Sequence, residues 1–321
     1  MESHASSTKK WKQVARVAGL ALAVFTLMVL QLEAGNTVLA ESTQITFPST
    51  AAAGAALVRA AKDDNEAALA EILGIDSKLL LGTGDNDTHK VAFMAFVSKY
   101  EKMNRWVDMS DGSRVLYIGA DNFAFPVPLA KNDSGQWYFD SVAGSEEIRA
   151  RDIGRNELLT MDTCSALAGA QQVYFAISGD PATYAERIIS TPGRQDGLYW
   201  PAAEKRVASP LANLSEFAGS PLAKLSPGAP LVIDGYTLRI LTAQGEDAPG
   251  GARSYMVNGK LTGGFAILAA PIKYAETGIM TFMAGSDGAI YERDLGPETV
   301  KIAASIQKFN PTNDWAQVRI R

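Results

Sequence analysis

The stretch of sequence richest in recognition chemistry lies between residues 187 and 200. Two arginines, an aspartate, a tyrosine and a tryptophan fall within its fourteen residues: Arg187, Arg194, Asp196, Tyr199 and Trp200. Proline and glycine residues interrupt the stretch and predict a loop. Because arginine and aromatic side chains on loops are typical of binding surfaces, we interpret residues 187–201 as a candidate recognition loop, with Trp200 and Arg194 partly exposed beside each other.

A structural interpretation competes with this one. Tyr199 and Trp200 would plug the seam between the two halves of the chain, while Arg194 and Asp196 would brace the turn. Removing the Trp200 ring would then cost packing energy. On a recognition loop, by contrast, Arg194 would contribute little to folding.

Few residues offer nucleophilic or metal chemistry. The chain has one cysteine, Cys164, and two histidines, of which only His89 follows residue 40. A transition-metal shell or an iron–sulfur cluster needs more of these side chains. A Ser–His or Cys–His pair would need distant residues to meet His89, and nothing in the sequence supports that. We therefore expect no catalytic residue, no metal and no cofactor. We expect His89 to be a solvated surface residue and Cys164 to be a small core side chain.

Carboxylates are the remaining candidates for catalysis. Glu157 or Asp162 could serve a hydrolase as acid or base, and this is the alternative function. Against it, no acid–base pair stands out in the sequence. We therefore favour a non-enzymatic binding or interaction protein.

Composition and charge narrow the class of partner. Hydrophobic residues make up 47% of the chain and charged residues 20%, which favours a folded core over disorder. The formal net charge is −5, which argues against a nucleic-acid partner because phosphate recognition needs a basic surface.

Residues 1–40 predict a signal peptide. An apolar run from Val17 to Leu30 follows four basic residues, Lys9, Lys10, Lys12 and Arg16. Val38-Leu39-Ala40 fits a signal-peptidase site, so cleavage is expected between Ala40 and Glu41. The apolar run spans about 21 Å as a helix, shorter than the roughly 30 Å of a bilayer core. A retained anchor is the alternative. We expect a periplasmic or secreted protein with no membrane span after cleavage, and an unknown envelope protein or polymer as its partner.

The order of elements predicts an α+β fold in two units. Residues 41–145 form the expected N-terminal α+β unit. Its helices are expected over 49–62, over 66–73 and from Asp87 onward. Its strands, which would form a curved antiparallel sheet, are expected at 114–119, 123–130 and 136–140.

Residues 146–321 form the expected C-terminal unit, a long helix followed by an antiparallel sheet. The helix is predicted over 146–177 with a break at Gly154. An irregular stretch over 179–228 precedes the strands, which are expected at 236–242, 254–257, 260–269, 278–284 and 289–293. Asn258-Gly259 predicts a two-residue hairpin turn. Pro297 predicts the start of a last helix that ends near Lys308.

Short motifs give the chain a family resemblance. Among them are Ile153-Gly154-Arg155-Asn156-Glu157-Leu158, Ile189-Ser190-Thr191-Pro192-Gly193-Arg194, Asp196-Gly197-Leu198-Tyr199-Trp200-Pro201, Ser209-Pro210-Leu211, Leu241-Thr242-Ala243-Gln244-Gly245, Val257-Asn258-Gly259, Gly264-Phe265-Ala266 and Asp294-Leu295-Gly296. With them the chain resembles a bacterial family of exported proteins, domain of unknown function 2950 (DUF2950), from about Phe47 to Trp315. The resemblance implies an envelope or secreted protein and carries over no activity or functional residues.

Two weaker resemblances concern the fold alone. Residues 47–145 look like the cone-shaped domains of the nuclear-transport-factor type, in which helices wrap a curved sheet. Residues 155–295 are similar in layout to pilin globular heads. The chain departs from pilins because no apolar helix precedes this part at the mature N-terminus.

Overall fold

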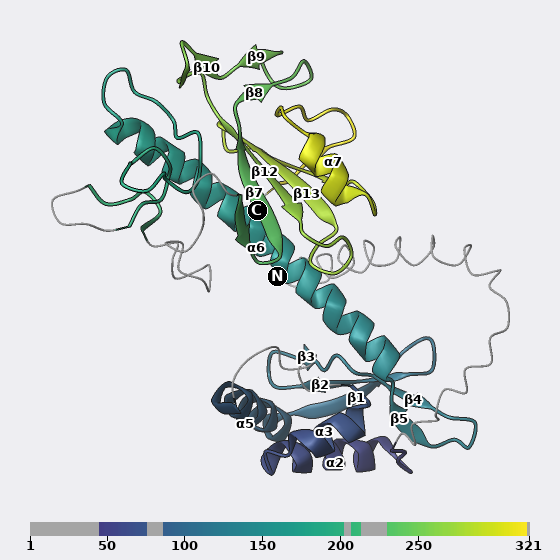
Figure 1. Ribbon diagram of the computed structural model, residues 1–321. Helices are drawn as coiled ribbons and strands as arrows, with labels where there is room; N and C mark the ends of the chain where they lie inside the picture. Colours follow the sequence, from purple (N-terminus) through teal and green to yellow (C-terminus); the bar gives the residue numbers. More distant parts are fainter. Residues whose placement is uncertain (1–44, 76–85, 202–206, 213–229, 320–321) are drawn as a thin grey trace, which may run out of the picture. The chain divides into compact units, whose positions relative to one another are not determined.

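The computed structural model describes residues 45–75, 86–201, 207–212 and 230–319 (Figure 1). The predicted signal peptide and its cleavage site lie outside the described residues. Of the helices that are described, none combines the length and the apolar character that crossing a membrane requires.

Side-chain caps set the ends of the first helices. The described chain opens with α2 (Thr50–Lys62), α3 (Glu66–Leu73) and α5 (Asn86–Lys102). The Ser49 hydroxyl accepts a hydrogen bond from the Ala52 N–H at 3.1 Å, and the Asn65 side-chain oxygen accepts one from the Ala68 N–H at 3.0 Å. Gly74 ends α3 in a left-handed conformation with φ 66°. These caps confirm the predicted bounds of α2 and α3.

The first sheet is antiparallel and consists of short strands. They are β1 (Asn104–Asp108), β2 (Arg114–Ile118), β3 (Phe123–Ala124), β4 (Leu129–Lys131) and β5 (Trp137–Phe139). Their order is β1-β2-β4-β5, and β3 pairs with β2 beside this path. The single strand predicted over 123–130 is wrong. Pro126 and Pro128 have no N–H to donate to a ladder, and the segment divides there into β3 and β4.

The first hydrophobic cluster, which we call the N-terminal core, joins these helices to the sheet. Its fully or nearly buried members include Leu57 of α2, Leu73 of α3, Phe93 of α5, Leu116 of β2 and Phe139 of β5. Phe125 packs edge to face on Phe139, with ring centroids 6.4 Å apart. The burial of these apolar side chains holds the helices on the sheet.

Helix α6 (Ser141–Ile177) runs for 37 residues. Asp140 caps it, since its carboxylate accepts hydrogen bonds from the N–H groups of Val142 at 3.1 Å and Ala143 at 2.9 Å. The helix therefore starts five residues before the predicted position 146. The predicted break at Gly154 is also wrong. A glycine inside a helix costs only about 1 kcal/mol relative to alanine, and its backbone can still form the helical hydrogen bonds.

The second sheet is also antiparallel. It contains β6 (Leu231–Ile233), β7 (Tyr236–Leu241), β12 (Ala266–Pro271), β13 (Met280–Gly285), β14 (Ile290–Asp294) and β15 (Ala316–Gln317). The strand order is β15-β14-β13-β12-β7-β6. The helix predicted after Pro297 is α7 (Thr299–Ser305), which ends before the predicted Lys308.

Two short ladders lie beside this sheet. They are β8 (Ala243–Gln244) with β9 (Arg253–Ser254), and β10 (Met256–Val257) with β11 (Lys260–Leu261). The predicted turn at Asn258-Gly259 joins β10 to β11, and both turn residues have positive φ. The strand predicted over 260–269 is interrupted, because Gly263 and Gly264 separate β11 from β12.

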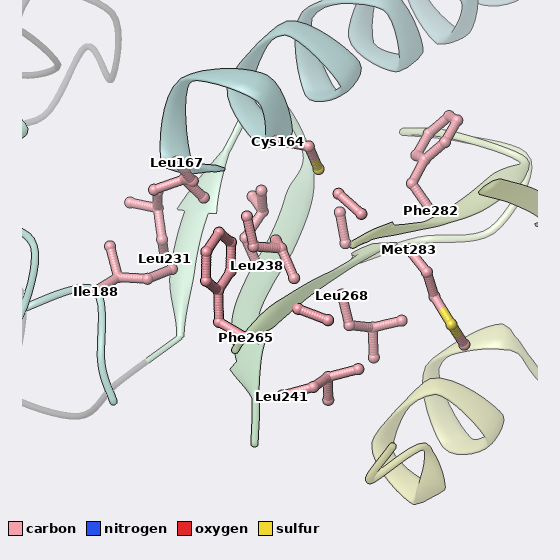
Figure 2. Close-up of a cluster of buried hydrophobic side chains, with 14 of the residues drawn as sticks. Cys164, Leu167, Ile188, Leu231, Leu238, Leu241, Phe265, Leu268, Phe282 and Met283 are labelled. Atoms are coloured by element: carbon pink, nitrogen blue, oxygen red, sulfur yellow. The ribbon is translucent and has the colours of Figure 1, made fainter. Parts of the chain in front are cut away.

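The C-terminal core, the second hydrophobic cluster, includes buried residues from α6 and from both faces of the second sheet. Figure 2 shows Cys164 and Leu167 of α6 among the strand residues of this core. On the side of α7, Arg239 of β7 donates to the carbonyl oxygens of Ala303 and Ile306. The helices and antiparallel sheets confirm the α+β class.

The predicted division of the chain near residue 145 stays a prediction. The buried residues fall into two clusters, one on each side of the middle of α6. The contacts nevertheless join Ile45–Arg321 in one unit. Helix α6 is the element that both clusters share, because Ile148 belongs to the first and Cys164 to the second.

Two glycines of α6 differ in what an added methyl group would meet. At Gly144 it would lie 2.8 Å from Cγ1 of Val127, whereas at Gly169 no atom lies within 4 Å. We expect Gly144→Ala to lower the free energy of unfolding by about 1–3 kcal/mol through overpacking. We expect Gly169→Ala to raise it by about 0.5–1 kcal/mol because alanine favours the helix. Chemical denaturation measures both effects.

A double mutant tests the cause of the Gly144 effect. Val127→Ala makes room beside the helix, so the two changes together should cost less than the sum of the single changes. A Gly144→Ala protein as stable as the wild type would contradict the close packing of α6 on Val127.

Candidate functional site

The candidate recognition loop folds back on itself. Ile189 and Tyr199 form a parallel β-bridge. The Ser190 N–H donates to the Tyr199 carbonyl at 2.9 Å, and the Tyr199 N–H donates to the Ile188 carbonyl at 2.8 Å. The two arms of the loop therefore lie side by side, which places Arg187 near Asp196.

Asp196 organises the turn between the arms. Its carboxylate accepts hydrogen bonds from the Thr191 N–H at 2.7 Å and the Thr191 hydroxyl at 2.8 Å. The Arg187 guanidinium lies 3.9 Å away and donates to the Thr191 hydroxyl at 3.1 Å. Burial alone would raise the pKa of Asp196, but the hydrogen bonds from Thr191, followed by the charge of Arg187, hold it below its usual value.

Trp200 is buried and not on the surface. Its relative exposure is 4%, and its indole N–H donates to the Val207 carbonyl at 2.9 Å. Its ring packs edge to face on Tyr174 with centroids 6.4 Å apart. Arg194 is exposed and Tyr199 is half-buried. The expectation that Trp200 is partly exposed beside Arg194 is therefore wrong, because burying a large aromatic ring stabilises the fold.

A polar cleft of about 260 Å³ opens beside this loop. Its walls come from the C-terminal end of α6, the segment 178–187, the loop and the β10–β11 hairpin. The lining residues are Tyr174, Ser178, Asp180, Pro181, Thr183, Tyr184, Glu186, Arg187, Asp196, Lys260 and Leu261. Of the five predicted loop residues, only Arg187 and Asp196 line the cleft.

A fully buried amide fixes one wall of the cleft. The Gln171 side chain donates to the Ala185 carbonyl at 2.8 Å and accepts from the Ala185 N–H at 2.8 Å. The Tyr184 N–H donates to the Leu261 carbonyl at 2.7 Å, which ties the wall to β11. Gln171 was not among the residues predicted from the sequence. The available signal was a polar residue seven positions after Cys164, on the apolar face of the same helix.

The cleft carries charges of both signs. Asp180, Glu186 and Lys260 are exposed, and no ion pair within the described residues joins any of them to another side chain. The Tyr174 hydroxyl donates to the Gln195 carbonyl at 2.9 Å. Burial, followed by the charges of Asp196 and Glu186, raises the pKa of Tyr174, so its hydroxyl stays neutral. The cleft thus presents charged groups over a rigid polar wall.

Comparison with known proteins identifies a family. Residues 44–318 match the family model described as "Protein of unknown function (DUF2950)". The chain belongs to the DUF2950 family. The searches of curated proteins and of solved structures returned no match. The motif resemblance is therefore confirmed over most of this DUF2950 chain.

The carboxylate of Glu157 fixes α6 to the second sheet. One oxygen accepts hydrogen bonds from the N–H groups of Ile279 at 2.9 Å and Met280 at 3.0 Å. The Asn156 amide donates to the Thr277 carbonyl at 3.0 Å. Asp162 is exposed and five residues away, about 140° around the helix, so the two carboxylates cannot act as a pair.

The negative charge of Glu157 affects a second carboxylate, that of Glu292. Burial, followed by the negative charge of Glu157, raises the pKa of Glu292 on β14. Burial and the same charge also raise the pKa of Tyr236. The sequence did not predict this influence, because the two residues lie on α6 and β14, far apart along the chain. Neither Glu157 nor Glu292 lines the polar cleft.

The structure also places the histidine and the cysteine. His89 is 6% exposed, and its Nδ1 lies 2.8 Å from the Glu66 carboxylate. The expected solvated histidine is therefore wrong, because α5 turns this side chain inward. Cys164 is a buried core side chain, as expected, and burial raises its pKa to about 12. Among the described residues, no group of three or more His, Cys, Asp or Glu side chains is placed to share a metal ion.

Substitutions at Trp200 and Arg194 separate packing from surface chemistry. Trp200→Ala should lower the free energy of unfolding by about 3–5 kcal/mol, because it empties a packed site. Arg194→Ala, the control on the same loop, should change it by no more than about 0.5 kcal/mol. Thermal melts of both variants measure this. A strongly destabilised Arg194→Ala protein would show instead that Arg194 braces the turn.

The raised pKa of Glu292, which burial causes first and the charge of Glu157 second, predicts a pH-dependent stability. The folded state raises the pKa of Glu292, so its charged form destabilises the fold at neutral pH, and the penalty disappears as pH falls below that raised pKa. Glu292→Gln should therefore stabilise the protein at pH 7 by roughly 0.5 kcal/mol, after allowance for solvent screening. The gain should shrink towards pH 4.

Denaturation curves at both pH values measure the Glu292 effect. Glu246→Gln, at an exposed turn position, is the matched control and should change little. An equal gain for Glu292→Gln at both pH values would contradict the electrostatic origin.

Proposed function

We propose that this DUF2950 protein is an exported envelope protein that works by binding a partner and not by catalysis. The observation that carries the binding function is the polar cleft, where Asp180, Glu186 and Lys260 stand exposed over a wall fixed by Gln171. A preorganised polar wall reduces the entropy lost on binding. The basic, apolar and small-residue pattern of residues 1–40 supports export.

The size of the cleft limits what enters it. A volume of about 260 Å³ lies just below the usual range of small-molecule pockets, roughly 300–1,000 Å³. The cleft therefore suits one polar or charged group of a larger partner, such as a side chain of an envelope protein or one unit of a polymer. Its mixed charge favours a partner group that carries both a donor and an acceptor.

A hydrolase that uses carboxylates is the second candidate. The raised pKa of Glu292 beside Glu157 favours it, because acid–base sites use such shifts. Two observations weigh against it. Glu157 already accepts two backbone hydrogen bonds that hold α6, and neither carboxylate lines the polar cleft. Binding is therefore the function that the geometry supports better.

Capture from a native envelope extract tests the proposal. The protein should be recovered outside the cytoplasm with an intact mass that begins at Glu41. The double variant Glu186→Ala/Lys260→Ala should lose most partner capture with little change in melting temperature, because both side chains are exposed.

The matched control is Lys273→Ala/Glu276→Ala, an exposed pair of opposite charges away from the cleft. It should capture the partner as the wild type does. Equal capture by both double variants would contradict binding at the cleft. A full-length chain extracted from the membrane would contradict the cleaved signal.

A further inference from the structure

A second cavity lies beside the N-terminal core, among α2, α3, α5 and the first sheet. Its volume is about 330 Å³. Its deepest walls are the buried side chains of Leu57, Leu69, Phe93, Ile118 and Phe125. Ala92 and Ala95 of α5 and Phe123 of β3 are exposed at its rim. Among the described residues that line it, Lys99 alone is not apolar.

Two cationic side chains, Lys99 paired with Asp121 and Arg151 paired with Glu147, lie where this apolar cavity opens. The Lys99 ammonium lies 5.3 Å from the centre of the Phe123 ring, and the Arg151 guanidinium lies 5.5 Å from the same centre. Lys99 also pairs with Asp121 at 2.7 Å, and both side chains are exposed. Because exposed ion pairs contribute little, the anionic group of a ligand can replace Asp121 at Lys99.

We propose that this apolar cavity binds a single-chain amphiphile with an anionic head group. The alkyl chain fills the interior, and the head group pairs with Lys99 at the rim. A polar ligand would lose its hydrogen bonds to water against these walls. A cationic head group could not pair with Lys99 in place of Asp121. The described residues that line the apolar cavity and those that line the polar cleft are different, so this proposal does not depend on the proposed function.

The volume sets the length of the chain. An apolar cavity of about 150 Å³ accepts one benzene ring, which has six carbon atoms. By that measure, the apolar cavity holds roughly twelve carbon atoms, since its volume is about 330 Å³. We therefore expect medium-chain ligands to fit best.

Calorimetry with the full-length protein and a series of fatty acids tests chain length. Each added methylene should strengthen binding about fourfold, so affinity should rise from octanoate to dodecanoate by roughly two hundredfold. Hexadecanoate should add little beyond dodecanoate because its chain exceeds the cavity. Dodecyl phosphate should also bind. Comparing its affinity with that of dodecanoate shows whether the cavity prefers a phosphate ester or a fatty acid.

A pair of variants tests the location. Ala95→Phe places a ring over the cavity from an exposed position of α5 and should weaken dodecanoate binding at least about tenfold. Met94→Phe is the matched control: Met94 is exposed on the same helix, does not line the cavity, and its replacement should leave binding unchanged. Thermal melts verify that both variants fold, and Ala92→Leu serves as the second filling variant.

A second pair of variants tests the head group. Lys99→Gln should weaken dodecanoate binding about two- to fivefold and leave dodecanol binding unchanged. Lys90→Gln, at an exposed position of the same helix, is the control. Tighter binding of dodecyltrimethylammonium than of dodecanoate would overturn the anionic preference. No binding of dodecanoate, or binding that Ala95→Phe and Ala92→Leu leave intact, would overturn the proposal itself.

Discussion

Helix α6 contributes buried side chains to both hydrophobic cores while remaining one continuous helix, and the rest of the structure depends on this constraint. Near its start, Gly144 lets the helix approach Val127, and Arg151 donates to the Ala124 carbonyl at 2.8 Å. Farther along, the Glu157 carboxylate accepts hydrogen bonds from the N–H groups of Ile279 and Met280 at the start of β13. The helix is therefore fixed by close packing at one end and by polar contacts to strand backbone near its middle.

The two cavities differ in their lining: the one beside the N-terminal core is apolar, and the one beside the C-terminal core is polar. Around the N-terminal core, helices cover a sheet and leave an apolar space between them. Beside the C-terminal core, loops that follow α6 meet the β10–β11 hairpin and enclose polar groups. The apolar cavity depends on side-chain packing, whereas the polar cleft depends on backbone hydrogen bonds that Gln171 helps to hold. The polar cleft should therefore keep its shape when its surface charges change.

Local signals in the sequence predicted much of the fold, and long-range contacts account for the rest. Ser49, Asn65 and Asn258-Gly259 act on their own neighbours, so their caps and turn could be read directly. The short strands β1, β6 and β15 went unpredicted because their two to five residues show no clear alternation, and pairing partners elsewhere define them. At the candidate site, the loop was predicted, but the burial of Trp200 depends on Tyr174, which lies 26 residues away.

The burial of Cys164 also has a consequence for the proposed export. A lone thiol in an oxidising compartment would ordinarily invite mixed disulfides with other proteins. The reactive species in such exchange is the thiolate, and a pKa of about 12 leaves almost none of it at neutral pH. The C-terminal core also closes off the sulfur from any attacking disulfide. In the folded chain, Cys164 should therefore not react in a disulfide-forming environment. It becomes reactive only if the C-terminal core opens.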